Sequence, residues 1–104
     1  MAYAGRVEVR LAGKLGSIDR YTWDLPDANV TCRQLGFPAA ELAVRGATYI
    51  FGAKGITGMD IQWIENVQCL GTESLLHECP HNVSFTPGPR LDAGVVCKSN
   101  NLGK

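Results

Sequence analysis

The stretch "WDLPDANVTCRQLG", residues 23–36, carries the start and stop signals of one α-helix. Asp24 is a plausible N-cap, Asp27 follows three positions later, and Pro26 falls in the first turn. Gly36 is placed to end the helix, because glycine readily adopts the left-handed conformation that follows many helix C-termini. We therefore predict a helix of about three turns between Asp24 and Gly36.

The apolar residues of this predicted helix lie on one side of it. Those that recur at intervals of three and four residues are Leu25, Ala28, Cys32 and Leu35. This spacing is typical of a helix face that packs against a hydrophobic core. Cys32 is therefore expected to point inward, and the partner of its bond must lie in the core.

The N-terminal segment "GRVEVRLAG", residues 5–13, alternates between apolar and charged side chains. Such alternation is typical of a half-buried strand, so we predict a single strand that ends at a turn glycine. The apolar set is Val7, Val9 and Leu11, and the charged set is Arg6, Glu8 and Arg10.

The segments after the helix carry shorter signals. Residues 37–58 contain scattered glycines, which predict loops and short edge strands, with "AVRGATYIFG" the most strand-like piece. Residues 59–69, "MDIQWIENVQC", predict a strand with a bulge or an end near Ile64 and Val67. The residues expected to share one face of that strand are Ile61, Trp63 and Glu65.

Three further signals precede the C-terminus. "GTESLLHEC", residues 71–79, predicts a helix of about one to two turns with Thr72 as its N-cap and Pro80 as its stop. "FTPGPR", residues 85–90, predicts a loop because of its prolines. "DAGVVC", residues 92–97, predicts a short buried strand.

Length and composition indicate one globular module. The chain has 104 residues, of which 45% are apolar, and this size allows one domain with one core. Ten basic residues balance ten acidic ones, so we expect no nucleic-acid partner. No apolar stretch approaches the roughly 18 residues of a membrane helix, so we expect no direct membrane insertion. Residues 1–4 and 99–104 are interpreted as ends or linkers of a piece excised from a longer secreted or membrane-anchored chain.

The cysteines indicate the compartment. Four cysteines occur without a Cys-x-x-Cys pair, at Cys32, Cys69, Cys79 and Cys97. This spacing argues against a redox motif or a zinc ribbon, and an even number in a small domain favours two structural disulfides of an extracellular protein. Two Asn-x-Ser/Thr triplets, at Asn29 and Asn82, are candidate glycosylation sites and fit the same compartment.

Four phrases occur in order along the chain: "GRVEV" at 5–9, "WDLPDANVTCRQLGFP" at 23–38, "VQCLGTESLLHECPH" at 67–81 and "DAGVVC" at 92–97. Together they resemble the scavenger receptor cysteine-rich family over residues 5–98, which we interpret as one domain. The resemblance implies an α+β fold in which a curved antiparallel sheet of about six short strands cradles one main α-helix, with a second short helix. It also implies the disulfides Cys32–Cys97 and Cys69–Cys79, one of the three pairings that four cysteines permit.

The chain departs from the family pattern at one disulfide. Relatives typically read W-G-T-V-C-D-D-G-W-D where this chain reads "LGSIDRYTWD", so Asp19 stands at a cysteine position. The usual partner of that cysteine falls on Pro87. Because both ends are missing together and no orphan thiol remains, we predict a variant with two disulfides.

The resemblance also implies a cation site in many relatives, which bind calcium or magnesium through several acidic residues. The positions that carry those ligands are occupied here by Arg20, Tyr21, Leu91 and about Thr86, and only Glu65 remains acidic. A hard cation needs several oxygen ligands, so we expect neither a metal nor a cofactor in this domain.

Two arginines are candidates to replace that cation. If the fold is kept, Arg20 and Arg90 approach one surface, where their guanidinium groups suit sulfate, phosphate or carboxylate. Asp92 would weaken such a site if it paired with either arginine. The glycine-rich loop "FGAKGITGMD" is longer than in most relatives, and Lys54 and Ile56 at its tip are further candidate contacts.

The segment "HECPHNVS", residues 77–84, combines two histidines with a cysteine and a glycosylation triplet. With Cys79 bonded to Cys69, it offers no thiolate to a metal, and nothing places a catalytic base beside it. His77 and His81 are therefore expected at the surface of a helix end. Asn82 follows a proline turn and is the better glycan acceptor, because Asn29 lies on the predicted helix.

The sequence thus predicts an extracellular, non-enzymatic recognition domain of a receptor or mosaic secreted protein. Its expected partners are a protein or polyanionic ligand and the neighbouring domains of its parent chain. The alternative is an accessory or spacer domain of a multidomain extracellular enzyme, such as a protease or an amine oxidase. A hydrolase or redox enzyme would need free thiols or a cofactor pocket.

Overall fold

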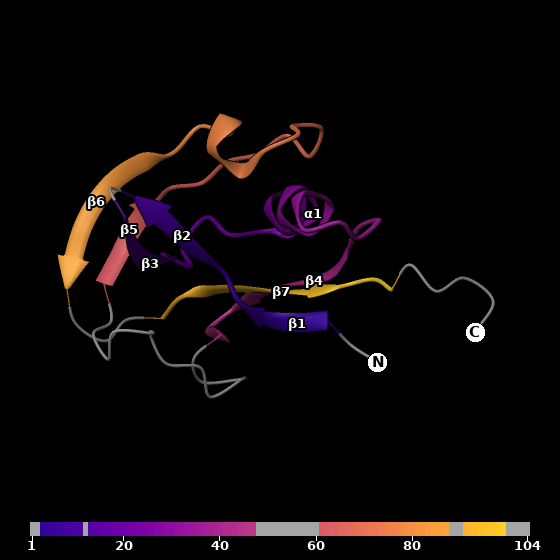
Figure 1. Cartoon of the computed structure of the whole chain (residues 1–104), viewed down its shortest axis with the longest axis horizontal. Coiled ribbons are helices and arrows are strands. Elements are labelled where there is room, and N and C mark those ends of the chain that lie inside the picture. Colours follow the sequence, from indigo (N-terminus) through magenta and orange to yellow (C-terminus); the bar gives the residue numbers. More distant parts are fainter. Residues whose placement is uncertain (1–2, 12, 48–60, 88–90, 100–104) are drawn as a thin grey trace.

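A computed structural model describes residues 3–11, 13–47, 61–87 and 91–99 (Figure 1). Within these ranges the chain forms one α-helix, one short 3₁₀-helix and seven strands. In chain order the elements are β1 (Tyr3–Arg6), β2 (Glu8–Leu11), β3 (Lys14–Ile18), α1 (Leu25–Gln34), β4 (Ala40–Arg45), β5 (Ile61–Glu65), η1 (Leu76–Glu78), β6 (Asn82–Pro87) and β7 (Ala93–Cys97).

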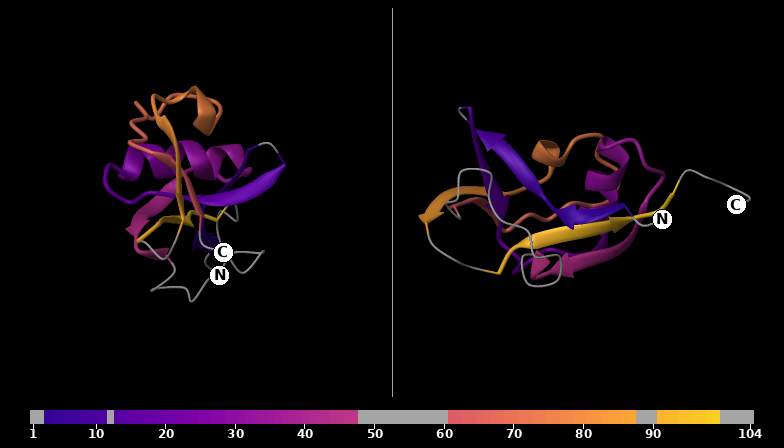
Figure 2. Two further views of the ribbon diagram at one scale, coloured as in Figure 1. Left: turned by 90° about the vertical axis from the view of Figure 1, so that its left-hand side faces the viewer. Right: turned by 60° about the horizontal axis from the view of Figure 1, so that its bottom comes forward.

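The strands form two sheets rather than one. The first sheet has the order β1-β7-β4, and the second has the order β2-β3-β5-β6. The pairing of β3 with β5 is parallel, and the other strand pairs are antiparallel. The helix α1 lies between the first sheet and η1 (Figures 1 and 2). The predicted α+β class, with one main helix and a second short helix, is confirmed.

The N-terminal segment is two strands instead of the single strand predicted. The chain leaves the first sheet after Arg6 and enters the second at Glu8. Val7 lies between them, 8% exposed, and its N–H donates to the carbonyl of Ala93 at 3.0 Å. The alternating pattern therefore predicted extended backbone correctly, but the change of partner strand depends on tertiary contacts that such a pattern does not encode.

The helix begins and ends where its signals predicted. The Asp24 carboxylate accepts the N–H of Asp27 at 3.5 Å, and the Asp27 carboxylate accepts the N–H of Asp24 at 3.0 Å. These two bonds form a capping box, which satisfies backbone donors at the helix start. Gly36 has a φ of +99°, so it has the left-handed conformation expected just after the helix.

The buried face of α1 differs from the face that the spacing predicted. Ala28 and Cys32 are fully buried, but Leu25 and Leu35 are 44% and 63% exposed. The polar residues of the helix that are buried instead are Asp27 and Thr31. Asp27 is buried because its carboxylate has backbone donors to bond, which periodicity alone cannot indicate.

The core joins α1 to β7, the central strand of the first sheet. Trp23 is fully buried, and its indole Nε1 donates to the carbonyl of Gly94 at 2.8 Å. The disulfide Cys32–Cys97 links the helix to the end of β7, with 5.6 Å between the two Cα atoms. Closing a loop with a sequence separation of 65 stabilises the fold by up to about 4 kcal/mol on a chain-entropy argument.

The helix predicted for residues 71–79 is present as a single 3₁₀ turn, and its predicted N-cap was wrong. The described chain forms only the short η1 there, and Thr72 does not cap it, because the residue before η1 is Leu75. Side chains take the backbone donors that a longer helix would have used. The Glu78 carboxylate accepts the N–H of Leu75 at 3.3 Å, and the Gln34 amide oxygen accepts that of Leu76 at 2.7 Å.

The strands β5 and β6 bear on two further expectations, of which one is confirmed and one is wrong. The register of β5 against β6 shifts between Gln62 and Ile64, so the predicted bulge is confirmed, and Ile64 is buried at 6% exposure. Residues 85–87 belong to β6 and not to a loop. Because β6 is at the edge of its sheet, the missing N–H of Pro87 breaks no ladder inside the sheet.

Candidate functional site

The turn that follows β3 contains Arg20 and is contacted by a second arginine, Arg45. The N–H of Trp23 donates to the carbonyl of Arg20 at 3.1 Å, which closes the turn. Arg45, at the end of β4, donates from Nε to the carbonyl of Trp23 at 2.8 Å. The guanidinium carbon of Arg20 lies 5.0 Å from the ring centroid of Tyr21, whose side chain is largely exposed. We call Arg20, Tyr21 and Arg45 the arginine turn.

The arginine turn lies beside the segment that precedes β7. Asp19 forms an isolated antiparallel β-bridge with Asp92 and donates its N–H to the carbonyl of Ile64 at 2.9 Å. Arg90, Lys54 and Ile56 lie outside the described residues, so their part in ligand binding remains a prediction. Arg45 was not among the residues predicted for the site, because it meets the turn only through folding.

Asp92, considered as a partner for Arg20 or Arg90, bonds to Arg6. The Arg6 Nη1 to Asp92 Oδ2 distance is 3.2 Å, and the Arg6 Nη2 to Glu8 Oε2 distance is 2.7 Å. The Arg6 side chain is 4% exposed and that of Asp92 is 2% exposed. An ion pair buried to this degree fixes β1 beside β7, because replacing either side chain would take a charged partner from a buried group.

The positions at which the family resemblance implied cation ligands have a different chemistry here. Arg20 and Tyr21 stand where acids are expected, and Glu65 is half-buried at the end of β5. In the described part of the chain, one set of three ligand-type atoms lies within 4.8 Å of one another, on Cys69, Glu73 and Cys79. The two sulfurs are bonded to each other, so this set does not provide thiolate ligands.

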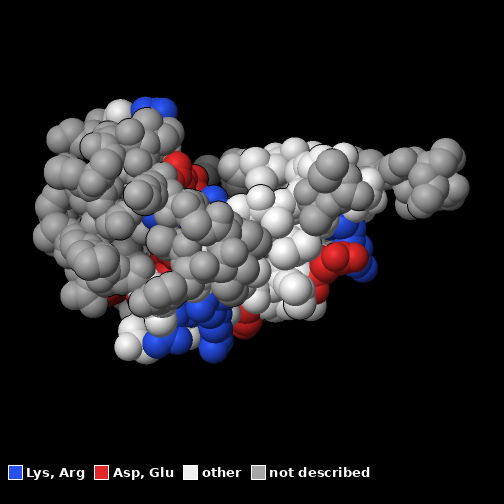
Figure 3. Space-filling view, turned by 90° about the horizontal axis from the view of Figure 1, so that it is seen from below, with Lys and Arg blue, Asp and Glu red and all other residues white. Residues whose placement is uncertain are grey.

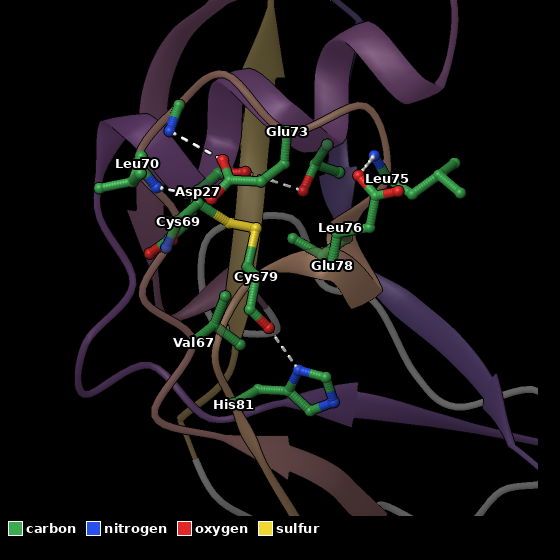
Figure 4. The surroundings of a disulfide bond; sticks show 12 residues. Asp27, Val67, Cys69, Leu70, Glu73, Leu75, Leu76, Glu78, Cys79 and His81 are labelled. Carbon is green, nitrogen blue, oxygen red and sulfur yellow. Dashed lines mark hydrogen bonds between the residues drawn. A yellow bond between two sulfur atoms is a disulfide. The ribbon is translucent and has the colours of Figure 1, made fainter.

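The disulfide Cys69–Cys79 closes a loop that Asp27 attaches to the helix (Figure 4). The Asp27 carboxylate accepts the N–H of Cys69 at 2.7 Å and that of Asp24 at 3.0 Å. Burial raises the pKa of Asp27 to about 7, and the neighbouring Asp24 adds to this, although the bonds from backbone N–H groups oppose it. The group is thus a buried acid that both positions the loop and titrates near neutral pH.

Glu73 holds the other side of this loop. Its carboxylate accepts the N–H groups of Leu70 and Gly71, both at 3.0 Å. These backbone bonds lower the pKa of Glu73, because they favour the ionised form. Arg33 also ties the end of α1 to the loop by donating to the carbonyl of Glu73 at 3.1 Å.

The two histidines on either side of Cys79, His77 and His81, differ in exposure. His77, in η1, is exposed, as predicted, whereas His81 is half-buried. His81 Nδ1 lies 2.6 Å from the carbonyl oxygen of Cys79. Because a carbonyl only accepts, Nδ1 must be the donor and carry the proton, which fixes the ring beside the disulfide (Figure 4).

The two glycosylation triplets lie in different surroundings. Asn29 is half-buried on α1, and its Oδ1 accepts the N–H of Ala40 at 2.8 Å, so its amide already has a structural role. Asn82 is exposed at the start of β6, next to Val83, which is 68% exposed. This contrast favours Asn82 as the acceptor.

Comparison with known proteins identifies the family. The sequence profile of the scavenger receptor cysteine-rich domain matches residues 1–98, and the chain belongs to this family. It is 38% identical to the egg peptide speract receptor of Strongylocentrotus purpuratus over 96 residues, which is 89% of this chain and 17% of that protein. It is 38% identical to lysyl oxidase homolog 3 of Mus musculus over 104 residues, 96% of this chain and 13% of that protein.

Further relatives agree. Galectin-3-binding protein of Pongo abelii is 39% identical over 95 residues, 89% of this chain and 15% of that protein. The scavenger receptor cysteine-rich domain of mouse MARCO, in a dimeric form, superimposes with a TM-score of 0.72 at 33% identity, covering 94% of this chain and 89% of that one. The third such domain of murine neurotrypsin gives 0.67 at 36% identity, covering 94% and 88%. The chain thus spans less than a fifth of the length of these curated relatives.

These findings confirm several predictions. The family, the α+β fold, the pairing of Cys32 with Cys97 and of Cys69 with Cys79, and the extracellular character of the domain all stand. None of the four cysteines is free. Among the described residues, no helix is both long and apolar enough to cross a bilayer.

Proposed function

We propose that this domain is an extracellular recognition module that binds a polyanionic ligand, or an acidic surface of a protein, through the arginine turn. The observation that carries the proposal is the Arg45–Trp23 hydrogen bond, which holds a second guanidinium against the turn that contains Arg20. Binding would use the rigid surface as it stands, without a divalent cation and without chemistry of its own.

The two guanidiniums suit this role for a physical reason. Arg45 is exposed and uses Nε to bond the Trp23 carbonyl, so its two terminal nitrogens are not needed for that bond and can donate to the oxygens of a sulfate, phosphate or carboxylate. Arg20 is half-buried against the Tyr21 ring, so less side-chain freedom is lost on binding. A pre-oriented guanidinium binds oxyanions in a bidentate way that lysine cannot reproduce.

Nearby acidic groups limit the site to a local patch. The Asp19 carboxylate accepts the N–H of Tyr21 at 3.3 Å, so one negative charge lies beside Arg20. Figure 3 shows that the basic side chains on one face are scattered, with acidic side chains among them, and that an uncharged stretch lies between those on its two sides. We therefore expect Arg90, and the Lys54 and Ile56 loop, to add affinity to the arginine turn rather than to form separate sites.

The experiment measures binding of the disulfide-bonded domain to heparin and to dextran sulfate, with and without a chelator. We expect binding that survives chelation and weakens as salt rises, because counterions compete for the arginines. The combined Arg20→Ala and Arg45→Ala variant should lose at least about tenfold in affinity, since two charge-assisted contacts disappear. Adding Arg90→Ala should weaken binding further.

Lys98→Ala is the control, because Lys98 is exposed and follows Cys97, which pairs with Ala40, whereas Arg45 pairs with Ala93 at the other end of the same ladder. It should change the affinity by no more than about twofold. Equal losses in the control and in the arginine-turn variant, or unchanged binding in the latter, would contradict the proposal.

An accessory role is the second candidate. Its support is the similarity to lysyl oxidase homolog 3, of which the matching region is 13%. A domain of this kind would space or orient a neighbouring domain. The absence of saturable binding to both polyanions, with and without calcium, would favour it.

A further inference from the structure

The structure has a cleft of about 550 Å³, and none of the three residues of the arginine turn lines it. One wall is the β1–β2 segment, residues 3–10, and the opposite wall is formed by the end of α1 and by η1. Its volume lies in the range of clefts that hold small organic ligands, about 300–1,000 Å³.

The lining of the cleft is mainly apolar. Its floor contains Ile64, Val67 and Val95, which are 6%, 2% and 5% exposed, so the cleft reaches the hydrophobic core. At one end Tyr3 and Phe37 stand together, with 4.6 Å between their ring centroids. Leu35, which was predicted to face the core, instead lines the cleft with 63% of its surface exposed.

The charged groups that line the cleft differ in their ion-pair partners. Glu8 lines it, and its carboxylate lies 2.7 Å from Nη2 of Arg6, whose guanidinium also contacts the buried Asp92. Arg10 also lines it, and its Nη1 donates to the carbonyl of Gly13 at 2.9 Å. No described carboxylate lies within ion-pair distance of Arg10. Arg10 is therefore the group of the cleft that can pair with a ligand carboxylate, and it lies at the β2 end.

We propose that this cleft binds a molecule with one unbranched apolar chain and a carboxylate head. The chain lies between α1 and the β1–β2 segment, and the carboxylate pairs with Arg10. A polyanion suits the cleft poorly, because its walls are apolar and one guanidinium is available. A cationic amphiphile is disfavoured as well, because Glu8 already has its partner.

Calorimetric titration of the disulfide-bonded domain with octanoate, decanoate and dodecanoate tests this proposal. We expect saturable binding of one molecule, about fifteenfold tighter for each step of two methylenes until the cleft is full. Decan-1-ol, which lacks the charge, should bind up to about fivefold more weakly than decanoate. The signals of Val95 and Leu76, which line the cleft, should shift in NMR spectra.

Two pairs of variants locate the site. Leu35→Glu places a charge in the cleft wall and should weaken decanoate at least about tenfold, since apolar contact is replaced by a repelling carboxylate. Leu42→Glu is its control, because Leu42 has a similar exposure of 58% and does not line the cleft. Arg10→Gln should abolish the preference for decanoate over decan-1-ol, whereas Arg45→Gln should preserve it.

Three results would overturn the proposal: equal effects of Leu35→Glu and Leu42→Glu, an affinity independent of chain length, or unsaturable detergent-like uptake. A carboxylate preference that survives Arg10→Gln would overturn the assignment of the head group. Because Arg45→Gln probes the arginine turn separately, loss of heparin binding with intact decanoate binding, or the reverse, distinguishes this site from the proposed function.

Discussion

Two regions of the molecule each contain a disulfide: the first is α1 with the first sheet, and the second is the loop from Val67 to His81. The two regions differ in which groups accept the hydrogen bonds of their backbone N–H groups. In the first region regular ladders satisfy the backbone, and the fully buried Trp23 fills the core. In the loop, side chains such as Asp27 and Glu73 accept the backbone N–H groups. The comparison teaches that, where the chain is too short to form regular secondary structure, side-chain carboxylates accept the backbone hydrogen bonds that backbone carbonyls would otherwise accept.

The largest expected effect comes from removing each disulfide. Replacing Cys32 and Cys97 by alanine should cost about 4 kcal/mol, because the sequence separation of 65 leaves a long unconstrained loop in the unfolded chain. Replacing Cys69 and Cys79, with a separation of 10, should cost about 3 kcal/mol. Urea unfolding measures both; an equal or reversed order would mean that native contacts, and not loop length, decide.

The effect expected next is the pH dependence of the free energy of unfolding, which is smaller per pH unit and comes from Asp27 at the loop. The pKa of Asp27 is raised to about 7, so between about pH 4 and pH 7 the folded state holds a proton that the unfolded state has released. Asp27 therefore lowers the free energy of unfolding as pH rises through this range, by at most about 1.4 kcal/mol per pH unit, and its effect is constant above it.

Asp27→Asn keeps an oxygen that can accept the Cys69 N–H but does not titrate. Relative to wild type, it should remove this decline in stability, which urea unfolding at several pH values would measure. A decline that persists in Asp27→Asn would assign the titration to another group.

The smallest effect compares two caps. Asp24→Ala should cost about 1 kcal/mol, because it removes the side chain that accepts the Asp27 N–H at the start of α1. Thr72→Ala should change stability by less than about 0.5 kcal/mol, because Thr72 caps no helix and is exposed. Thermal unfolding measures both, and a cost for Thr72→Ala as large as for Asp24→Ala would contradict this account of the loop.

Much of the fold could be predicted from local signals. The cap at Asp24, the glycine at Gly36 and the buried strand before Cys97 each rest on neighbours in sequence, and each was predicted correctly. The failures involve distant partners. Arg6 was expected with the charged set of a half-buried strand, but its guanidinium is buried with Asp92, 86 positions away.

The candidate site was predicted in part. Arg20 followed from the departure of "LGSIDRYTWD" from its family, but Arg45 joins it only because β4 ends beside Trp23. The cleft had no sequence signal, because its lining residues belong to several elements and read individually as ordinary core or surface positions.

The sequence by itself determined the family, the extent of the helix and which cysteines have partners, because end signals and motif order are local properties of the chain. Only the tertiary structure decided that the N-terminal strand divides between two sheets, that Asp27 and Arg6 are buried, and that a cleft lies beside α1. The physical reason is that burial of a charge depends on the partner that folding places next to it, and that partner is far away in sequence.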